Sequence, residues 1–406
     1  MTSSSNSLEL TLENRPFTAK WCPASSSCSN LLAIGHDTGI TVYKATEFAN
    51  GEPSMKDLVK LYTIHIGLPV LQLAFSANCI CSENEKEEKP QQDIQMEGLL
   101  ENNILDNYTL CFACACEDNT VRLIIARNDS IITQHVLGGK SGHHSFVNAI
   151  DIVDVYSADN KLAEQVIASV GDDNTLIIWR LTDNGPVLAG YSLSSPGISV
   201  EFHPVNPNHL LVGEKSGNVR VFDWTSPPNN TDESMGQDVS EQVSSITPWL
   251  YTLNVSQVVH SYRNAGLAST LANARWVGPD GTSILVVCKS GAWLRWDLFA
   301  KAGNGSYDME EDVGYPQPRT LLPDHQGASL FPTFCGACPH PRYPDYFMTA
   351  SSQRQGTLQL INVAEKGSSP NPVQLDGLIV GMDWHRNGNY VAVITDSSLY
   401  ITKVMG

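Results

Sequence analysis

Residues 166–181 constrain the fold more than any other part of the chain. Their sequence, VIASVGDDNTLIIWRL, places two apolar runs on either side of a polar turn, residues 171–175. β-Branched and aromatic residues around a turn that tolerates a left-handed backbone predict a β-hairpin. An isolated hairpin is only marginally stable in water and could not bury Trp179. We therefore expect this hairpin to be part of a larger sheet system.

The same pattern of an apolar strand, a polar turn and a second strand with an aromatic residue recurs in weaker form along the chain. Clear copies lie at residues 31–43, 210–224 and 284–298. Regular self-similarity of this kind is typical of chains built from repeated β units. We expect seven units, with cores at about residues 17–43, 70–125, 143–181, 198–224, 271–298, 334–362 and 379–404, and insertions at 82–107, 225–243 and 300–315.

Repeated short β units close radially into an all-β propeller, which leaves only short sheet edges. We therefore predict that residues 1–406 form one domain, a seven-bladed β-propeller. The last unit shows three strands before the sequence ends at Gly406. Residues 8–13, LELTLE, alternate as a half-buried edge strand does, and we predict that this N-terminal strand completes the last blade. The alternative is an open ring that a partner's strand completes.

Charge and composition limit the classes of function. The chain has 43 acidic and 25 basic residues, a net charge of −18, which opposes binding to a nucleic-acid backbone. No P-loop, dinucleotide fingerprint, HExxH motif or nucleophile elbow is present, so we expect no enzyme, no cofactor and no small-molecule substrate. No export signal and no apolar run of the ~20 residues needed to span a bilayer are present, so we expect neither secretion nor membrane insertion.

Two CxxC spacings among the ten cysteines raise the question of zinc. Cys111 and Cys114 lie in a segment with strand periodicity, where residues three apart point to opposite faces of a sheet and cannot share a metal. Cys335, Cys338 and His340 lie in a more turn-like segment, and the sequence leaves metal binding there open. We predict no metal site, because buried cysteine in a reducing compartment acts as a small hydrophobic residue.

The hairpin resembles a WD40 repeat, with Gly142-His143 about two dozen residues before its turn. In that family a His, a Ser, the turn Asp and a Trp form a buried hydrogen-bond network. The resemblance implies this structural role for His143, Ser169, Asp173 and Trp179. Buried polar groups of this kind need partners and fix the register of the strands. The alternative, a catalytic base at His143, is disfavoured because the pattern repeats without a fixed set of reactive groups.

A closer resemblance, to the nucleoporin 37 family, is carried by four segments in the same order. They are IASVGDDNT at 167–175, LSSPGISVEFHP at 193–204 followed by VGEKSGNVRVFD at 212–223, and GMDWHR at 381–386. These small WD-repeat nucleoporins belong to the Y-shaped outer ring complex of the nuclear pore. The resemblance implies a non-catalytic scaffold subunit at the nuclear envelope that docks on a larger scaffold nucleoporin, made of a propeller and a helical region, and supports protein and mRNA transport.

A ubiquitin-ligase substrate receptor or other WD40 adaptor is the alternative function. Such receptors often carry Trp-Asp-x-Arg at a strand end, and both candidate positions, 179–182 and 296–299, lack it. The sequence does not identify the residues that contact a partner. It also leaves open whether the acidic insertion at 82–107 is a docking segment or a solvated loop.

Overall fold

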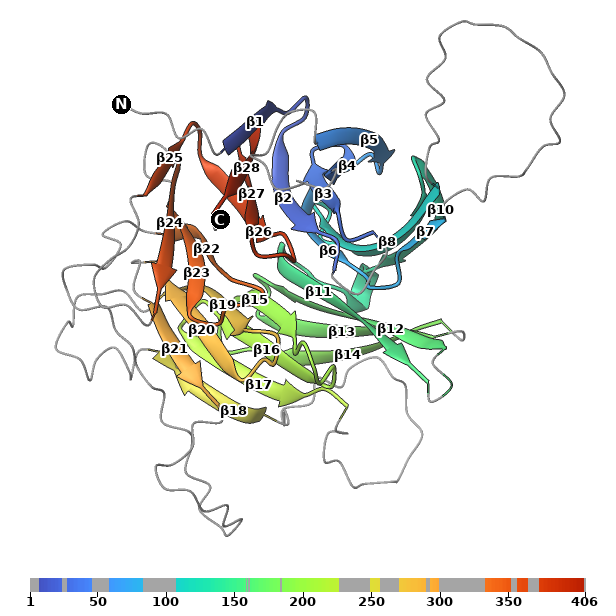
Figure 1. Cartoon of the computed structure of the whole chain (residues 1–406). Helices are drawn as coiled ribbons and strands as arrows, with labels where there is room; N and C mark the ends of the chain where they lie inside the picture. The colour runs from blue at the N-terminus through green and yellow to red at the C-terminus, as the bar shows by residue number, and fades with distance from the viewer. Residues whose placement is uncertain are drawn as a thin grey trace, which may run out of the picture.

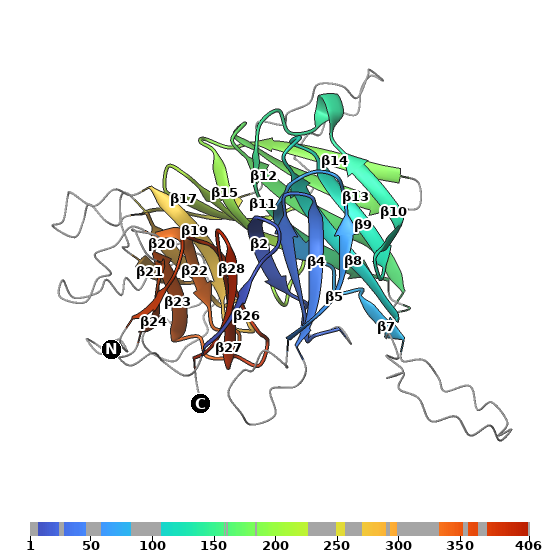
Figure 2. The same cartoon turned by 90° about the horizontal axis from the view of Figure 1, so that it is seen from above.

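The computed structural model describes residues 7–23, 28–45, 58–82, 107–157, 159, 161–182, 185–225, 249–255, 270–289, 293–298, 333–351, 356–363 and 372–404. Within these ranges the chain forms seven antiparallel sheets around a common axis, as a β-propeller (Figures 1 and 2). The predicted fold class, an all-β seven-bladed propeller, is therefore confirmed. We number the sheets as blades 1 to 7, starting from the sheet that contains β2 (Pro16–Trp21).

The innermost strands of the blades surround the central axis. Each packs against the inner strands of its two neighbours, and β26 packs against β2, which closes the ring. These strands are β2, β6 (Val70–Phe75), β11 (Val147–Tyr156), β15 (Gly197–Phe202), β19 (Leu271–Val277), β22 (Thr333–Pro339) and β26 (Ile379–Trp384).

The second strand of each blade carries much of the core. β3, β20 and β27 are buried at every position, which explains their continuous apolar sequences, since such strands pack on both faces. The second strands are β3 (Leu31–His36), β8 (Asn107–Cys116), β12 (Leu162–Gly171), β16 (His209–Glu214), β20 (Ser283–Cys288), β23 (Tyr346–Ser351) and β27 (Tyr390–Thr395).

The third strand of each blade pairs with the second strand, and the two are consecutive in the sequence on either side of the repeated turn. They are β4 (Gly39–Ala45), β9 (Val121–Arg127), β13 (Thr175–Thr182), β17 (Asn218–Asp223), β21 (Trp293–Asp297), β24 (Gly356–Asn362) and β28 (Ser398–Lys403).

A fourth, outer strand completes six of the seven sheets as described, while three strands of blade 5 are described. Most of the outer strands lie beyond the unit cores expected from sequence, because they carry no clear apolar pattern. Outer strands β10 and β14 are exposed at most positions. The outer strands are β5 (Leu58–His65), β10 (Ser130–Leu137), β14 (Gly185–Ser192), β18 (Trp249–Asn254), β25 (Val373–Leu375) and β1 (Ser7–Thr11), and a short β7 (Ile80–Ser82) also pairs with β8.

The N-terminal strand β1 forms the outer strand of blade 7. It pairs antiparallel with β28, so that Leu8 lies opposite Ile401 and Leu10 opposite Leu399. The Leu8 side chain is buried in an apolar cluster between blades 7 and 1. Three strands from the end of the chain and one from its beginning thus form a single sheet, and the predicted closure of the ring is confirmed (Figure 1).

Seven apolar clusters hold the blades together, one between each pair of neighbours. Cys111 packs in the cluster between blades 2 and 3, whereas Cys114 packs in the cluster between blades 1 and 2. The two thiols therefore lie on opposite faces of β8, as their spacing predicts. Burial raises the pKa of Cys111 to about 12, as expected for a thiol in an apolar core.

Three predicted insertions fall almost entirely outside the described residues. The ranges 82–107, 225–243 and 300–315 overlap the undescribed residues 83–106, 226–248 and 299–332. No helix in the described part of the chain is long and apolar enough to cross a bilayer.

Candidate functional site

The structure brings together the four residues expected to form the buried network of blade 3. His143 lies in the loop before β11, Ser169 on β12, Asp173 in the turn after β12, and Trp179 on β13. The His143 Nδ1–H donates to Asp173 Oδ2 at 3.0 Å, and His143 Nε2 lies 2.8 Å from Ser169 Oγ. Ser169 Oγ accepts in turn from Trp179 Nε1 at 2.9 Å. The network joins the strands of this blade to the loop that enters it.

This arrangement of Ser169, His143 and Asp173 has the connectivity of a catalytic triad, but its surroundings differ from those of an active site. A reactive serine needs a hydroxyl that substrate can reach. Ser169 is fully buried, and its oxygen already accepts the Trp179 N–H. No substrate can reach Ser169 Oγ while the blade is folded.

The hydrogen-bond donors around Asp173 keep its carboxyl group ionised. Burial alone would raise the pKa of its carboxyl, but hydrogen bonds from His143, Thr175 and the backbone of His144 hold this pKa well below its usual range. Thr175 donates through its hydroxyl at 2.6 Å, and His144 through its backbone N–H at 2.8 Å. A carboxylate with this many donors is stabilised in the charged form.

The turn itself imposes two backbone requirements. Asn174 has φ of 59°, a left-handed conformation that Asn tolerates better than most residues. Asn119 occupies the same place in the turn of blade 2 with φ of 63°. A Cβ on Gly171 would lie 2.7 Å from Phe146 O and 3.1 Å from His143 Nδ1. Glycine is therefore required where the network approaches the strand end.

Other blades replace the network with different polar groups. In blade 2, Asp118 accepts from Thr120 and from Arg122, so that an arginine takes the place of the histidine. In blade 4, the buried carboxylate of Glu214 accepts the backbone N–H of Ser194 at 2.9 Å. The common element is a carboxylate that holds the turn or the entering loop, and only blade 3 has the full His, Ser, Asp and Trp set among the described residues.

Asp173→Ala is expected to lower the free energy of unfolding by about 1–3 kcal/mol, because it leaves His143 and the His144 N–H without their acceptor. Urea unfolding measures this loss. The control is Asp172→Ala, which changes the neighbouring, exposed carboxylate and should shift stability by no more than about 0.5 kcal/mol. Equal stability of the two variants would contradict a structural role for the network. At a temperature where Asp173→Ala stays folded, its affinity for partners should not change.

A second set of carboxylates clamps neighbouring blades to one another around the axis. Each lies on an inner strand, and each accepts the backbone N–H of an apolar residue near the end of the next inner strand. The bonds run from Phe202 N to Asp151 Oδ2, from Trp276 N to Glu201 Oε2, and from Trp21 N to Asp383 Oδ2, each at 2.8 Å.

These clamps occupy one repeated position. All seven inner strands contain a register shift near their start, and in six of them the residue two positions after the shift occupies the position of the clamps. The residues at this position are Lys20, Ala74, Asp151, Glu201, Arg275 and Asp383. These residues were not predicted from the sequence, although a charged residue directly before an apolar one recurs at this position in five of the six strands and was a usable signal.

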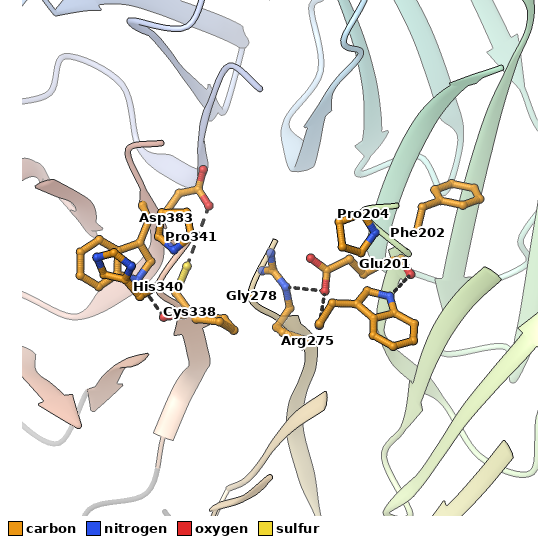
Figure 3. Close-up of a pocket in the computed structure, with 12 residues that line it drawn as sticks. Glu201, Phe202, Pro204, Arg275, Gly278, Cys338, His340, Pro341 and Asp383 are labelled. Atoms are coloured by element: carbon orange, nitrogen blue, oxygen red, sulfur yellow. Dashed lines mark hydrogen bonds and ion pairs between the residues drawn. The ribbon is translucent and has the colours of Figure 1, made fainter. Parts of the chain in front are cut away.

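The inner strands of blades 4 to 7 and the turns after them line a pocket of about 210 Å³, which we call the channel pocket (Figure 3). Figure 3 shows Arg275 between Glu201 on one side and Cys338 and Asp383 on the other. Arg275 Nε donates to Glu201 Oε2 at 3.0 Å, and Lys20 Nζ lies 3.7 Å from Asp383 Oδ1. Each carboxylate of the pocket wall therefore has its own cation within the protein.

Three histidines at the ends of inner strands connect consecutive blades next to this pocket. Each accepts backbone N–H groups of its own turn through Nδ1 and uses Nε2 to reach the following blade. His203 Nε2 lies 3.2 Å from Gly281 O, His340 Nε2 lies 2.9 Å from Gly388 O, and His385 Nε2 lies 3.3 Å from Asn30 Oδ1. His203 and His385 occupy equivalent positions in the sequences of blades 4 and 7, as HP and HR directly after the inner strand.

Burial lowers the pKa of His203, His340 and His385 below the usual value for histidine. The unfolded chain therefore binds protons more readily than the folded protein does. The contribution of these histidines to the free energy of unfolding is complete above pH 6.5 and falls as the pH drops below this value. We expect wild-type protein to lose stability between pH 7 and pH 5 through these groups. Urea unfolding should show a smaller loss in His340→Asn, while His135→Asn on the exposed face of β10 should match wild type. An identical pH dependence of all three proteins would contradict this role.

The candidate metal ligands are only partly described. The side chain of Cys335 lies outside the described residues, while Cys338 and His340 are buried. His340 Nδ1 accepts from the backbone of Arg342 and Tyr343, and its Nε2–H donates to Gly388, so both ring nitrogens have backbone partners. Among the described residues, no three His, Cys, Asp or Glu side chains are placed to hold one metal ion.

Comparison with known proteins identifies relatives along the whole chain. A family model described as the nucleoporin NUP37 N-terminal domain matches residues 144–315, which contain blades 3 and 4 and the described strands of blade 5. A WD repeat-containing protein of Schizosaccharomyces pombe is 55% identical over 406 residues, which cover 100% of this chain and 99% of that protein. Nucleoporin Nup37 of Drosophila melanogaster is 34% identical over 120 residues, 30% of this chain and 33% of that protein. Human nucleoporin Nup37 is 40% identical over 82 residues, 20% of this chain and 22% of that protein.

The Nup37 matches cover a third or less of those proteins, while the fission yeast match covers the whole chain. The seven-bladed ring, the His-Ser-Asp-Trp network of blade 3 and the NUP37 domain on blades 3 to 5 agree with one another. The chain belongs to the WD repeat-containing proteins, and its residues 144–315 resemble the nucleoporin NUP37 N-terminal domain.

Proposed function

We propose that this chain is a non-catalytic scaffold subunit of the nuclear pore complex, within its Y-shaped outer ring complex. There it docks on a larger scaffold nucleoporin and supports nucleocytoplasmic protein and mRNA transport. The observation that carries the proposal is the NUP37 domain on three consecutive blades of a closed ring. The similarity to nucleoporin Nup37 supports localisation at the nuclear pore complex.

The use of polar groups within the ring supports a scaffold role. The serine, histidine and aspartate of blade 3 bond to one another in the core, and the carboxylates around the axis hold backbone N–H groups of the next blade. These groups stabilise a rigid body that presents loops and strand edges to other proteins.

The test is affinity capture of the tagged endogenous protein together with imaging of the same tag. We expect a rim at the nuclear envelope and recovery of scaffold nucleoporins in stoichiometric amounts. Recovery of ubiquitin-ligase subunits without nucleoporins would contradict the proposal and favour the adaptor alternative.

A further inference from the structure

Arg275 presents hydrogen-bond donors to the channel pocket that the clamps do not use. Its Nε pairs with Glu201, whereas its terminal amino groups have no acceptor within the described part of the chain. The side chain is 25% exposed, so these amino groups are accessible from the pocket. A guanidinium fixed at Nε offers its outer edge in a set orientation, which suits a carboxylate.

Two further arginines extend the positive charge onto the rim of the pocket. Arg342 follows the pocket residue Pro341, and Arg386 lies in the equivalent turn of blade 7; both are exposed. Burial is the largest cause of the lowered pKa of His385, and the positive charges of Arg386 and Arg342 lower this pKa as well. Both guanidinium groups therefore act on the same part of the rim.

Charge at the channel pocket therefore differs from charge over the rest of the chain. Four cations line or flank the pocket, against four carboxylates, in a chain with 43 acidic and 25 basic residues. Two of the carboxylates are already paired with Lys20 and Arg275. The cations are Lys20, Arg275, Arg342 and Arg386, and the carboxylates are Asp151, Glu201, Asp280 and Asp383.

Apolar side chains stand beside these cations on the same turns. Val205 and Tyr343 are 66% and 55% exposed and follow the pocket residues Pro204 and Pro341. The Tyr343 ring lies against the ring of His340, with centroids 4.9 Å apart, which holds it in place. Exposed aromatic and aliphatic groups next to a pocket are typical of protein-binding surfaces.

We propose that the channel pocket and this rim bind an acidic, extended segment of a partner protein. Carboxylates of the segment bond to Arg275 and Arg342, and an apolar side chain packs on Tyr343 and Val205. A pocket of about 210 Å³ accommodates one or two side chains rather than a cofactor. A basic segment would meet the cations of the pocket and its rim, and a nucleic-acid backbone needs a more extended basic face than these four cations form. The inference rests on the proposed function, since it specifies a contact for a scaffold subunit.

A phage-displayed random dodecapeptide library, selected on the wild-type protein, tests the proposal. We expect selected peptides to be rich in Asp and Glu around one aromatic or aliphatic residue. Their affinity, measured by fluorescence anisotropy, should fall about tenfold in Arg342→Glu and in Tyr343→Ala, and should fall with added salt. Arg275→Lys keeps the positive charge beside Glu201 but loses the planar fork, so it should weaken binding with little loss of stability.

Arg127→Glu is the matched control, because it makes the same charge reversal at an exposed arginine on β9. Failure to enrich acidic peptides, or equal affinity of the Arg342→Glu and Arg127→Glu proteins, overturns the proposal. Capture of nucleoporins by the tagged protein is scored separately. If capture succeeds while the peptide experiment fails, the site is wrong and the proposed function stands; if wild type captures no nucleoporins, the function is wrong.

Discussion

Deletion of residues 1–13 should lower the free energy of unfolding by about 5–10 kcal/mol and the melting temperature by about 5–10 °C. The deletion removes the strand that pairs with β28 and takes Leu8 out of the cluster between blades 7 and 1. A buried leucine alone contributes about 2–5 kcal/mol. The backbone groups of β28 then face water, and the edge between the first and last blades opens.

The control is deletion of residues 1–6, which leaves β1 (Ser7–Thr11) intact and should melt as wild type does. Differential scanning calorimetry on both proteins gives the comparison. The longer deletion should also aggregate more readily on heating, because an unpaired β28 is an exposed apolar edge strand. An unchanged melting curve after deletion of residues 1–13 would show that β1 does not hold the ring closed.

The strands that are buried on both faces are the ones that were easiest to predict from the sequence. β20, SILVVC, and β27, YVAVIT, are apolar throughout and buried throughout, so pattern and environment agree. The outer strand β14, GPVLAGYS, is exposed at most positions and contains two glycines and a proline. Its conformation is set by pairing with β13 and not by its own composition, which is why no local signal revealed it.

The network of blade 3 could be predicted because the WD40 resemblance implies it, and its residues are found from their distances to a recognisable turn. The clamps around the axis were not predicted, because each joins residues at least 51 positions apart, as with Asp151 and Phe202. Such a pair becomes visible only once two repeats are aligned in space. Asp151 by itself resembles an ordinary charged residue in an amphipathic strand, although it belongs to the innermost strand of a propeller.

Asp151→Asn should raise the free energy of unfolding by about 3 kcal/mol at pH 7.5, which is the opposite of the usual effect of removing a buried polar group. Burial, together with the negative charge of Glu201, raises the pKa of Asp151 from 3.8 to about 6. The folded protein therefore holds this carboxylate ionised at neutral pH at a cost that the unfolded chain does not have. Asparagine removes the charge, and its side-chain oxygen still accepts the Phe202 N–H.

The pH dependence distinguishes this effect from a gain in packing. A carboxyl whose folded pKa is raised destabilises the protein above pH 6 and ceases to do so once both states are protonated, below about pH 4. The gain from Asp151→Asn should therefore shrink by roughly half at pH 5. Asp383→Asn is the contrasting variant, because Asp383 makes the same bond to a backbone N–H but also pairs with Lys20, so neutralising it should destabilise. Urea unfolding at both pH values measures these differences, and a loss of stability in Asp151→Asn at pH 7.5 would show that the clamp depends on its charge.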